Sequence, residues 1–238
     1  MKTKAISTLS STEIEMLIDK IPYFKDLSFN DHDQYQLLLS HSRLILLEPG
    51  ELLLQRGKTG NKIYFLAGGY IDVFSEDTPG EKALNQLTKG EIIGALSVIN
   101  DQPRTATLAA SQSYASETTK VIATDFRVFG KLHDFSKVKL STKIHFLQLV
   151  INNIRFKLST YQKQYPDHRL TQKRHNVGVF TGEAGTPEEL DSLAGQAFVL
   201  TLLLNNWNRE TESLLEVPKS TAKSKSKIFD FFSKKKSA

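Results

Sequence analysis

The chain contains no cysteine, and this absence removes several classes of chemistry. Disulfide bonds, thiolate metal sites and cysteine nucleophiles are all excluded. The six histidines are scattered and form no His-Glu-x-x-His pattern, so no metal site is expected. No Gly-x-Ser-x-Gly sequence is present, and no motif pairs the acidic residues. We therefore expect no catalytic residues, and a protein that is not an enzyme.

Long apolar runs are also missing. No stretch approaches the roughly 18 consecutive apolar residues of a membrane-spanning helix. Met1 to Ser11 carries two lysines with no apolar segment behind them, so no signal peptide is expected. These absences predict a cytoplasmic protein.

The excess of positive charge lies at one end of the chain. The formal net charge is +5, but residues 217–238 alone contribute +6 and leave −1 for the rest. The body therefore offers no general basic surface for duplex DNA, and nucleic acid is not the expected partner. The lysines of this tail are Lys219, Lys223, Lys225, Lys227, Lys234, Lys235 and Lys236.

The hydrophobic pattern predicts an α+β fold. Residues 1–11 are small and polar and are expected to be flexible. Helices are expected from Ser11 to about Ile21, where Pro22 ends the first helix, and from Asn30 to Ser40. Short strand-like runs separated by Gly and Pro then predict an antiparallel, jelly-roll-like β-roll within residues 12–134. The expected strands are 44–47, 52–55, 63–67, 70–75, 83–87, 105–110 and 117–123, followed by a short helix over 125–132.

The run from Gly90 to Thr107 is the most informative stretch of the sequence. A short apolar strand stops at Gly94, one helical turn follows, and the chain resumes as a strand at Arg104. A glycine that opens a helical turn lets backbone N–H groups converge on an anion. Arg104 can direct its guanidinium at the same anion. The pattern predicts a phosphate site.

This run resembles the phosphate-binding cassette of cyclic nucleotide-binding domains, the family of catabolite-activator-type regulators and kinase regulatory subunits. The resemblance covers roughly Ile21 to Leu132 and includes turn and strand positions at Pro49, Gly50, Gly57, Gly60, Tyr64, Gly69 and Val73. It implies a β-roll, no cofactor, and cyclic AMP, cyclic GMP or a cyclic dinucleotide as the candidate ligand. The implied ligand-binding residues are Gly94, Ala95, Leu96, Ser97, Arg104, Thr105 and Ala106.

Ala95 is a departure from the family pattern. The family places a glutamate here, which holds the ribose 2′-hydroxyl. Loss of a charge-assisted hydrogen bond costs about 1.5–3 kcal/mol, or roughly ten- to a hundredfold in affinity. The resemblance therefore implies a degenerate cassette.

Residues 135–164 carry a heptad pattern over about 22 residues, which predicts one long helix of about 33 Å. In the family, the helix after the roll forms the dimer interface, so the resemblance implies homodimerisation through this coiled-coil seam. The alternative is that the seam packs on its own roll or on the C-terminal helix. The seam residues are Leu140, Ile144, Leu147, Ile151, Ile154, Leu158 and Tyr161.

Residues 165–216 predict a polar connector and then one apolar helix from Thr186 to about Leu215. Regulators of the family carry a helix-turn-helix here, but this helix has no tight turn and few bases, so that unit is absent. Residues 217–238 predict a disordered basic tail that ends in an apolar group. That group resembles a docking motif for a protein partner or an anionic membrane; its residues are Ile228, Phe229, Phe231 and Phe232.

Three functions are compatible with these features. The first is a non-enzymatic sensor that binds a cyclic nucleotide or related phosphate ligand and signals through its helices and tail. The second is a ligand-free dimeric scaffold that docks through its tail. The third and weakest is a DNA-binding transcription regulator with an unrecognised reader.

Overall fold

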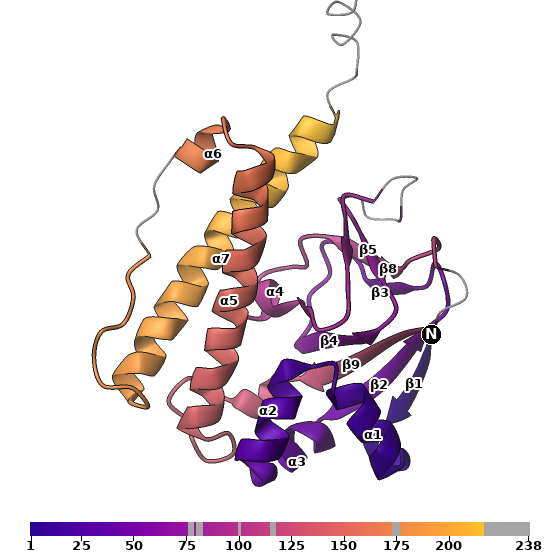
Figure 1. Ribbon diagram of the computed structural model, residues 1–238, viewed down its shortest axis with the longest axis vertical. Helices are drawn as coiled ribbons and strands as arrows, with labels where there is room; N and C mark the ends of the chain where they lie inside the picture. Colours follow the sequence, from indigo (N-terminus) through magenta and orange to yellow (C-terminus); the bar gives the residue numbers. More distant parts are fainter. Residues whose placement is uncertain (76–78, 80–82, 100, 115–117, 173–176, 217–238) are drawn as a thin grey trace, which may run out of the picture.

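The computed structural model describes residues 1–75, 79, 83–99, 101–114, 118–172 and 177–216. Two antiparallel sheets form a β-roll, helices from the N-terminal region cover one end, and two long helices lie along one side (Figure 1). This arrangement confirms the predicted α+β class. The predicted docking residues of the tail, including Phe229 and Phe231, lie outside the described residues.

The N-terminal segment differs from its prediction. Residues 1–11 were expected to be flexible, but β1 (Lys2–Ala5) pairs antiparallel with β2 (Ser42–Leu47) and η1 (Ile6–Thr8) follows it. The residues of β1 are mostly polar and exposed, so they do not alternate between apolar and polar. The hydrophobic pattern therefore did not predict this edge strand. α1 (Ser11–Ile18) begins with a capping box at Ser10 and Glu13.

A helix was also missed because Pro22 was interpreted as a helix terminator. Pro22 is instead the first residue of α2 (Pro22–Asn30), a position that tolerates proline because its missing N–H needs no partner. Asp31 then caps α3 (His32–Ser40).

The roll consists of two sheets with a core between them. One sheet has the order β1-β2-β9-β4-β7 and the other has the order β3-β8-β5-β6. Large apolar side chains such as Leu47, Leu66, Ile71 and Val121 are fully buried between them. The remaining strands are β3 (Leu52–Leu54), β4 (Lys62–Gly68), β5 (Ile71–Phe74), β6 (Asn85–Leu87), β7 (Ile92–Ile93), β8 (Thr107–Ala110) and β9 (Thr119–Asp125).

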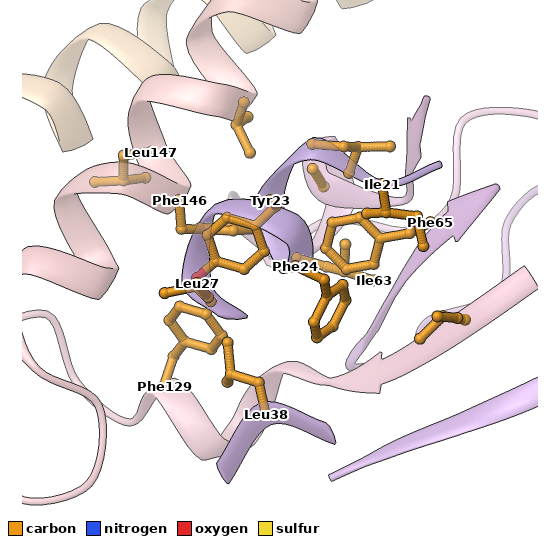
Figure 2. Close-up of a cluster of buried hydrophobic side chains, with 14 of the residues drawn as sticks. Ile21, Tyr23, Phe24, Leu27, Leu38, Ile63, Phe65, Phe129, Phe146 and Leu147 are labelled. Carbon is orange, nitrogen blue, oxygen red and sulfur yellow. The ribbon is translucent and has the colours of Figure 1, made fainter. Parts of the chain in front are cut away.

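Aromatic side chains join the roll to the long helix α5 (Leu140–Gln164). Figure 2 shows Tyr23 of α2 between Phe65 of β4 and Phe146 of α5. The ring of Tyr23 lies 6.0 Å from that of Phe65 and 5.7 Å from that of Phe146. Phe129 of η2 (Phe126–Phe129) contacts Phe146 from the other side. Because all four side chains are buried, this cluster fixes where α5 leaves the roll.

The loop before α5 is held by a buried lysine. Lys143 is 4% exposed and donates to the carbonyl oxygens of Lys131, Leu132 and Asp134 at 2.6, 3.0 and 2.7 Å. Burial lowers the pKa of its ammonium group, and nearby Asp134 raises it in part. This contact fastens the segment between the roll and α5.

The predicted long helix is present, but its apolar seam faces the same chain. α6 (Arg169–Gln172) and a connector lead to α7 (Pro187–Glu216), which packs along α5. Hydrogen bonds join Gln148 to Glu189 and Arg155 to Gln196, so residue numbers rise together and the two helices run parallel (Figure 1).

The seam for which the sequence analysis proposes dimerisation is therefore covered by α7. This agrees with the alternative, in which the seam packs on the C-terminal helix of the same chain. Five of its residues are buried in one cluster with Leu190, Leu193, Ala197, Leu200, Leu204 and Trp207. A seam covered in this way is not a free surface for a second subunit. The buried seam residues are Ile144, Leu147, Ile151, Ile154 and Leu158, while Leu140 and Tyr161 are half-buried beside them.

Candidate functional site

Arg104 lies where the predicted cassette meets a turn of the roll. β7 ends at Ile93, Gly94 turns the chain into α4 (Ala95–Ile99), and Arg104 precedes β8. The backbone of Arg104 is held by the turn before β4: Gly57 N donates to its carbonyl, and its own N–H donates to Lys58 O, both at 2.8 Å. The cassette and this turn thus position the same side chain.

The guanidinium of Arg104 is buried and donates four hydrogen bonds to the protein through its two Nη atoms. Nη1 donates to Gly94 O at 2.8 Å and to Ser97 Oγ at 2.6 Å. Nη2 donates to Gly60 O at 3.0 Å and to Lys62 O at 2.8 Å. Only 5% of the residue is exposed. Backbone dipoles from two segments of the roll therefore surround the cation.

Arg104 has no carboxylate partner within the described part of the chain. Its Cζ lies 5.9 Å from the centre of the Tyr64 ring. Burial lowers the pKa of the guanidinium, yet arginine remains a cation at neutral pH. A buried cation balanced only by dipoles attracts an anion more strongly than a cation that is already paired with a carboxylate. The site is suited to an anion.

Gly94 is required at this position for two reasons. Its φ of +82° is favourable only for glycine, and a Cβ there would collide with Nη1 of Arg104. The close approach of backbone and guanidinium depends on this missing side chain.

The other predicted ligand-binding residues lie differently. Ala95 is 7% exposed and belongs to the apolar cluster shared with α5 and α7, so no carboxylate accompanies Arg104 from this position. Leu96 packs on that same cluster, and Ala106 packs on the interior of the roll. Thr105 is half-buried beside Arg104. Of the seven predicted residues, the structure joins three by hydrogen bonds: Gly94, Ser97 and Arg104.

Sequence reasoning missed the carbonyl oxygens of Gly60 and Lys62 and the ring of Tyr64. Gly60 and Tyr64 were noted only as turn and strand positions. Backbone acceptors carry no residue-type signal, so the pattern could not assign them to the site. The glycine at position 60 was the available clue, since a Cβ there would lie 3.4 Å from Nη2 of Arg104.

The cassette contacts both long helices. Leu96, Val98 and Ile99 of α4 pack against the cluster formed by α5 and α7. Lys157 of α5 lies 3.6 Å from Glu91, which precedes β7. Burial lowers the pKa of the Lys157 ammonium group, and the charge of Glu91 partly offsets this. A displacement of α4 would therefore reach α5 and α7 directly.

A hollow lies elsewhere on the molecule and does not include the cassette. It has a volume of about 1270 Å³ between α1, α2 and the first sheet, where Leu17, Leu44 and Ala67 line it. The side chains of Lys20 and Lys25 at its rim already bind Asp19. This hollow lacks the surrounded cation that characterises the Arg104 site.

Neither a metal site nor a membrane-spanning helix is found among the described residues. They contain no group of three or more residues that could hold a metal ion. None of their helices is long and apolar enough to cross a membrane.

Comparison with known proteins gives a match to one domain family over the β-roll. The sequence profile described as "Cyclic nucleotide-binding domain" matches residues 44–127, which include the whole cassette. A cAMP-dependent protein kinase regulatory subunit of Mycosarcoma maydis is 28% identical over 83 residues, which are 35% of this chain and 16% of that protein. The corresponding subunit of Mucor circinelloides f. lusitanicus is 29% identical over 97 residues, 40% of this chain and 22% of that protein. The chain thus spans about a fifth of these relatives.

Solved structures show a partial likeness. The catabolite activator protein of Thermus thermophilus is 22% identical, with a TM-score of 0.39 over 59% of each chain. The regulatory domain of Toxoplasma gondii protein kinase A with cAMP is 20% identical, with a TM-score of 0.40 over 56% of this chain and 50% of that one. The profile match covers the β-roll and the whole cassette. Residues 44–127 of the chain thus match the cyclic nucleotide-binding domain family.

Proposed function

We propose that this protein is a non-enzymatic regulator that senses a cyclic nucleotide through the cassette around Arg104. The observation that carries the proposal is the buried guanidinium, which is surrounded by dipoles and has no carboxylate partner in the described chain. The relatives named above are regulatory subunits of a cAMP-dependent kinase, which supports the same class of ligand.

A phosphate would bind by exchanging acceptors at Arg104. Nη1 now donates to Gly94 O and Ser97 Oγ, and phosphate oxygens would replace one or both of these. The hydroxyl of Ser97, which now donates to Gly94 O, would have to turn from that carbonyl to donate to the same phosphate. Charge-assisted bonds to phosphate are stronger than bonds to neutral carbonyls, so the exchange is favourable once the ligand is desolvated.

This exchange of hydrogen-bond acceptors would affect α5 and α7 through α4. Gly94 and Ser97 stand at the start of α4, and α4 packs on the cluster of α5 and α7. A ligand shifts the equilibrium between two positions of α4 only if it binds the protein more tightly in one of them. Loss of the bond from Arg104 to Ser97 supplies that difference.

Ala95 sets the expected strength of binding. The α4 position that carries a ribose-binding carboxylate in the family is a buried methyl group here. We therefore propose a weak sensor that reads mainly the phosphate, with an affinity about ten- to a hundredfold below that of a complete cassette.

A ligand-free scaffold is the second candidate. The observations that favour it are that protein acceptors already bind both Nη atoms of Arg104 and that Ala95 is apolar. In that case the roll would only support α5, α7 and the tail, and the tail would bind a protein partner or an anionic membrane.

The experiment that separates the two candidates is a titration of the full chain with cyclic AMP and cyclic GMP. It is followed by calorimetry and by thermal unfolding, for the wild type and for Arg104→Lys. Lysine keeps the charge but cannot donate to several acceptors in one plane. The matched control is Arg127→Lys, because Arg127 is exposed and pairs with Asp125.

The sensor predicts stabilisation by ligand in the wild type and in Arg127→Lys, and its loss in Arg104→Lys. A ligand at about a hundredfold excess over Kd stabilises the fold by about 2.7 kcal/mol. The scaffold predicts no stabilisation at millimolar ligand in any of the three proteins. A ligand response that survives in Arg104→Lys would contradict the assigned site.

A further inference from the structure

The outer face of α7 carries an exposed apolar stripe. Phe198, Val199 and Leu202 are 49%, 42% and 46% exposed, whereas Leu200 and Leu204 on the inner face are nearly buried. Residues 198 and 202 are one helical turn apart and so lie on the same face. Gly195 belongs to this face too, and the space that a Cβ would fill there is open. α7 lies along α5 on one side of the roll (Figure 1).

One charged residue of each sign lies at either end of this stripe, at the same distance from it. Asp191 lies seven residues before Phe198, and Arg209 lies seven residues after Leu202. Seven residues are about two helical turns, so both charges share the face of the apolar residues. Both side chains are exposed. The pattern along α7 is acid, apolar pair, base, and its midpoint is Leu200.

We propose that the outer face of α7 binds a second copy of this chain, with the two α7 helices antiparallel about a two-fold axis beside Leu200. In that register Phe198 meets Leu202 of the partner subunit, and Asp191 meets Arg209 of the partner subunit. The symmetry repeats each contact, as a two-fold interface requires. A parallel pair would instead place like charges opposite each other.

The local contacts permit this register. Asp191 Oδ1 lies 2.8 Å from Nε2 of His133, and Arg209 donates to Asn206 at 2.6 Å, so each charged group is held at the surface. Gly195 lets the partner helix approach, because no side chain stands in the way. The α5–α7 packing remains intact in such a dimer, whereas a dimer through the α5 seam would require α7 to leave.

The interface is small, which sets its strength. Stable complexes bury about 800 Å² on each partner, and one helix face of about 27 Å between Asp191 and Arg209 offers less. We therefore expect a weak dimer, with a Kd of roughly 10 to 500 µM. Its charge pairs strengthen it at low ionic strength.

The test is sedimentation velocity of the full chain from about 5 µM to about 1 mM at low salt. Asp191→Arg and Arg209→Asp are measured separately and then mixed in equal amounts. Each variant alone sets like charges against each other at two symmetric contacts and should weaken association by about tenfold. In the mixture, every pair is again opposite in sign, so association should return as a heterodimer.

Two controls isolate the interface from the fold. His133→Ala removes the intramolecular partner of Asp191 but keeps its charge, and it should leave association unchanged. Leu202→Ser should weaken association without loss of helix content. The proposal is overturned by a wild type that stays monomeric to about 1 mM, which would leave this face to a different occupant. It is also overturned by charge variants that associate like the wild type, or by a mixture that fails to restore association.

Discussion

Replacement of Arg104 by methionine should reveal how much the buried cation contributes to the fold itself. Methionine has a similar length but donates no hydrogen bond, so Gly60 O, Lys62 O, Gly94 O and Ser97 Oγ would each lose a donor. A buried acceptor without its partner costs about 1–3 kcal/mol, and relief from burying the guanidinium offsets part of the total. We expect a net loss of about 3 kcal/mol in the free energy of unfolding.

The assay is denaturant unfolding followed by tryptophan fluorescence. Trp207 is the single tryptophan of the chain and is 3% exposed, so its emission reports loss of the folded state. A loss of about 3 kcal/mol lowers the melting temperature by about 6 to 12 °C in a chain of this size. Arg127→Met is the matched control and should change stability by less than about 1 kcal/mol, because its side chain is exposed.

One result would refute this reasoning. If Arg104→Met were as stable as the control at an unchanged denaturant m-value, the four hydrogen bonds would not be formed in solution. Arg104 would then be free in the unliganded protein, and ligand binding would not require the exchange of acceptors.

Three further predictions concern the long helices. In the wild type, the free energy of unfolding should rise with pH between the lowered pKa of Lys143 and its ordinary value of 10.5, because the unfolded chain holds the proton of this lysine more tightly. Lys143→Met should remove this rise. Denaturant unfolding of both proteins from neutral pH to pH 10.5 measures the difference. Truncation after Gln164 should expose the α5 seam and produce oligomers in light scattering, and a monomeric fragment with intact helix content would contradict this. Leu200→Ala should lower the free energy of unfolding by about 2–5 kcal/mol, because Leu200 is buried. Leu202→Ala at micromolar concentration should change it by less than about 0.5 kcal/mol, because Leu202 is exposed. Equal effects in denaturant unfolding would show that α7 is rotated from the described position.

The sequence predicted the roll, and placed Arg104 near Gly94, for identifiable reasons. Glycine and proline mark the turns between strands, and the spacing from Gly94 to Arg104 indicated that the arginine side chain lies near the turn at Gly94. It failed at Pro22, because a proline that ends one helix and a proline that begins the next look alike locally. It also could not reveal that Arg104 binds backbone carbonyls, since every residue supplies one.

The α5 seam shows a different limit. The heptad pattern correctly identified the helix and its buried face, with Ile151 and Ile154 at the centre. A heptad pattern specifies that a helix packs against another helix but not whether that helix belongs to the same chain. α7 carries its own apolar residues at helical spacing, such as Leu200 and Leu204, and it supplies the partner.

The parallel packing of α5 and α7 has a practical consequence for how the chain can be divided. Parallel neighbours require the connector to run back along their length, and its described residues 177–186 lead back to the start of α7 (Figure 1). The buried contacts that hold α7, including the stack of Trp207 on Tyr161, do not depend on that connection. Two separate polypeptides, one ending before Gly182 and one beginning there, should therefore reassemble by themselves. The fold would then serve as a split pair, in which α7 becomes a detachable peptide and fluorescence of Trp207 reports its return.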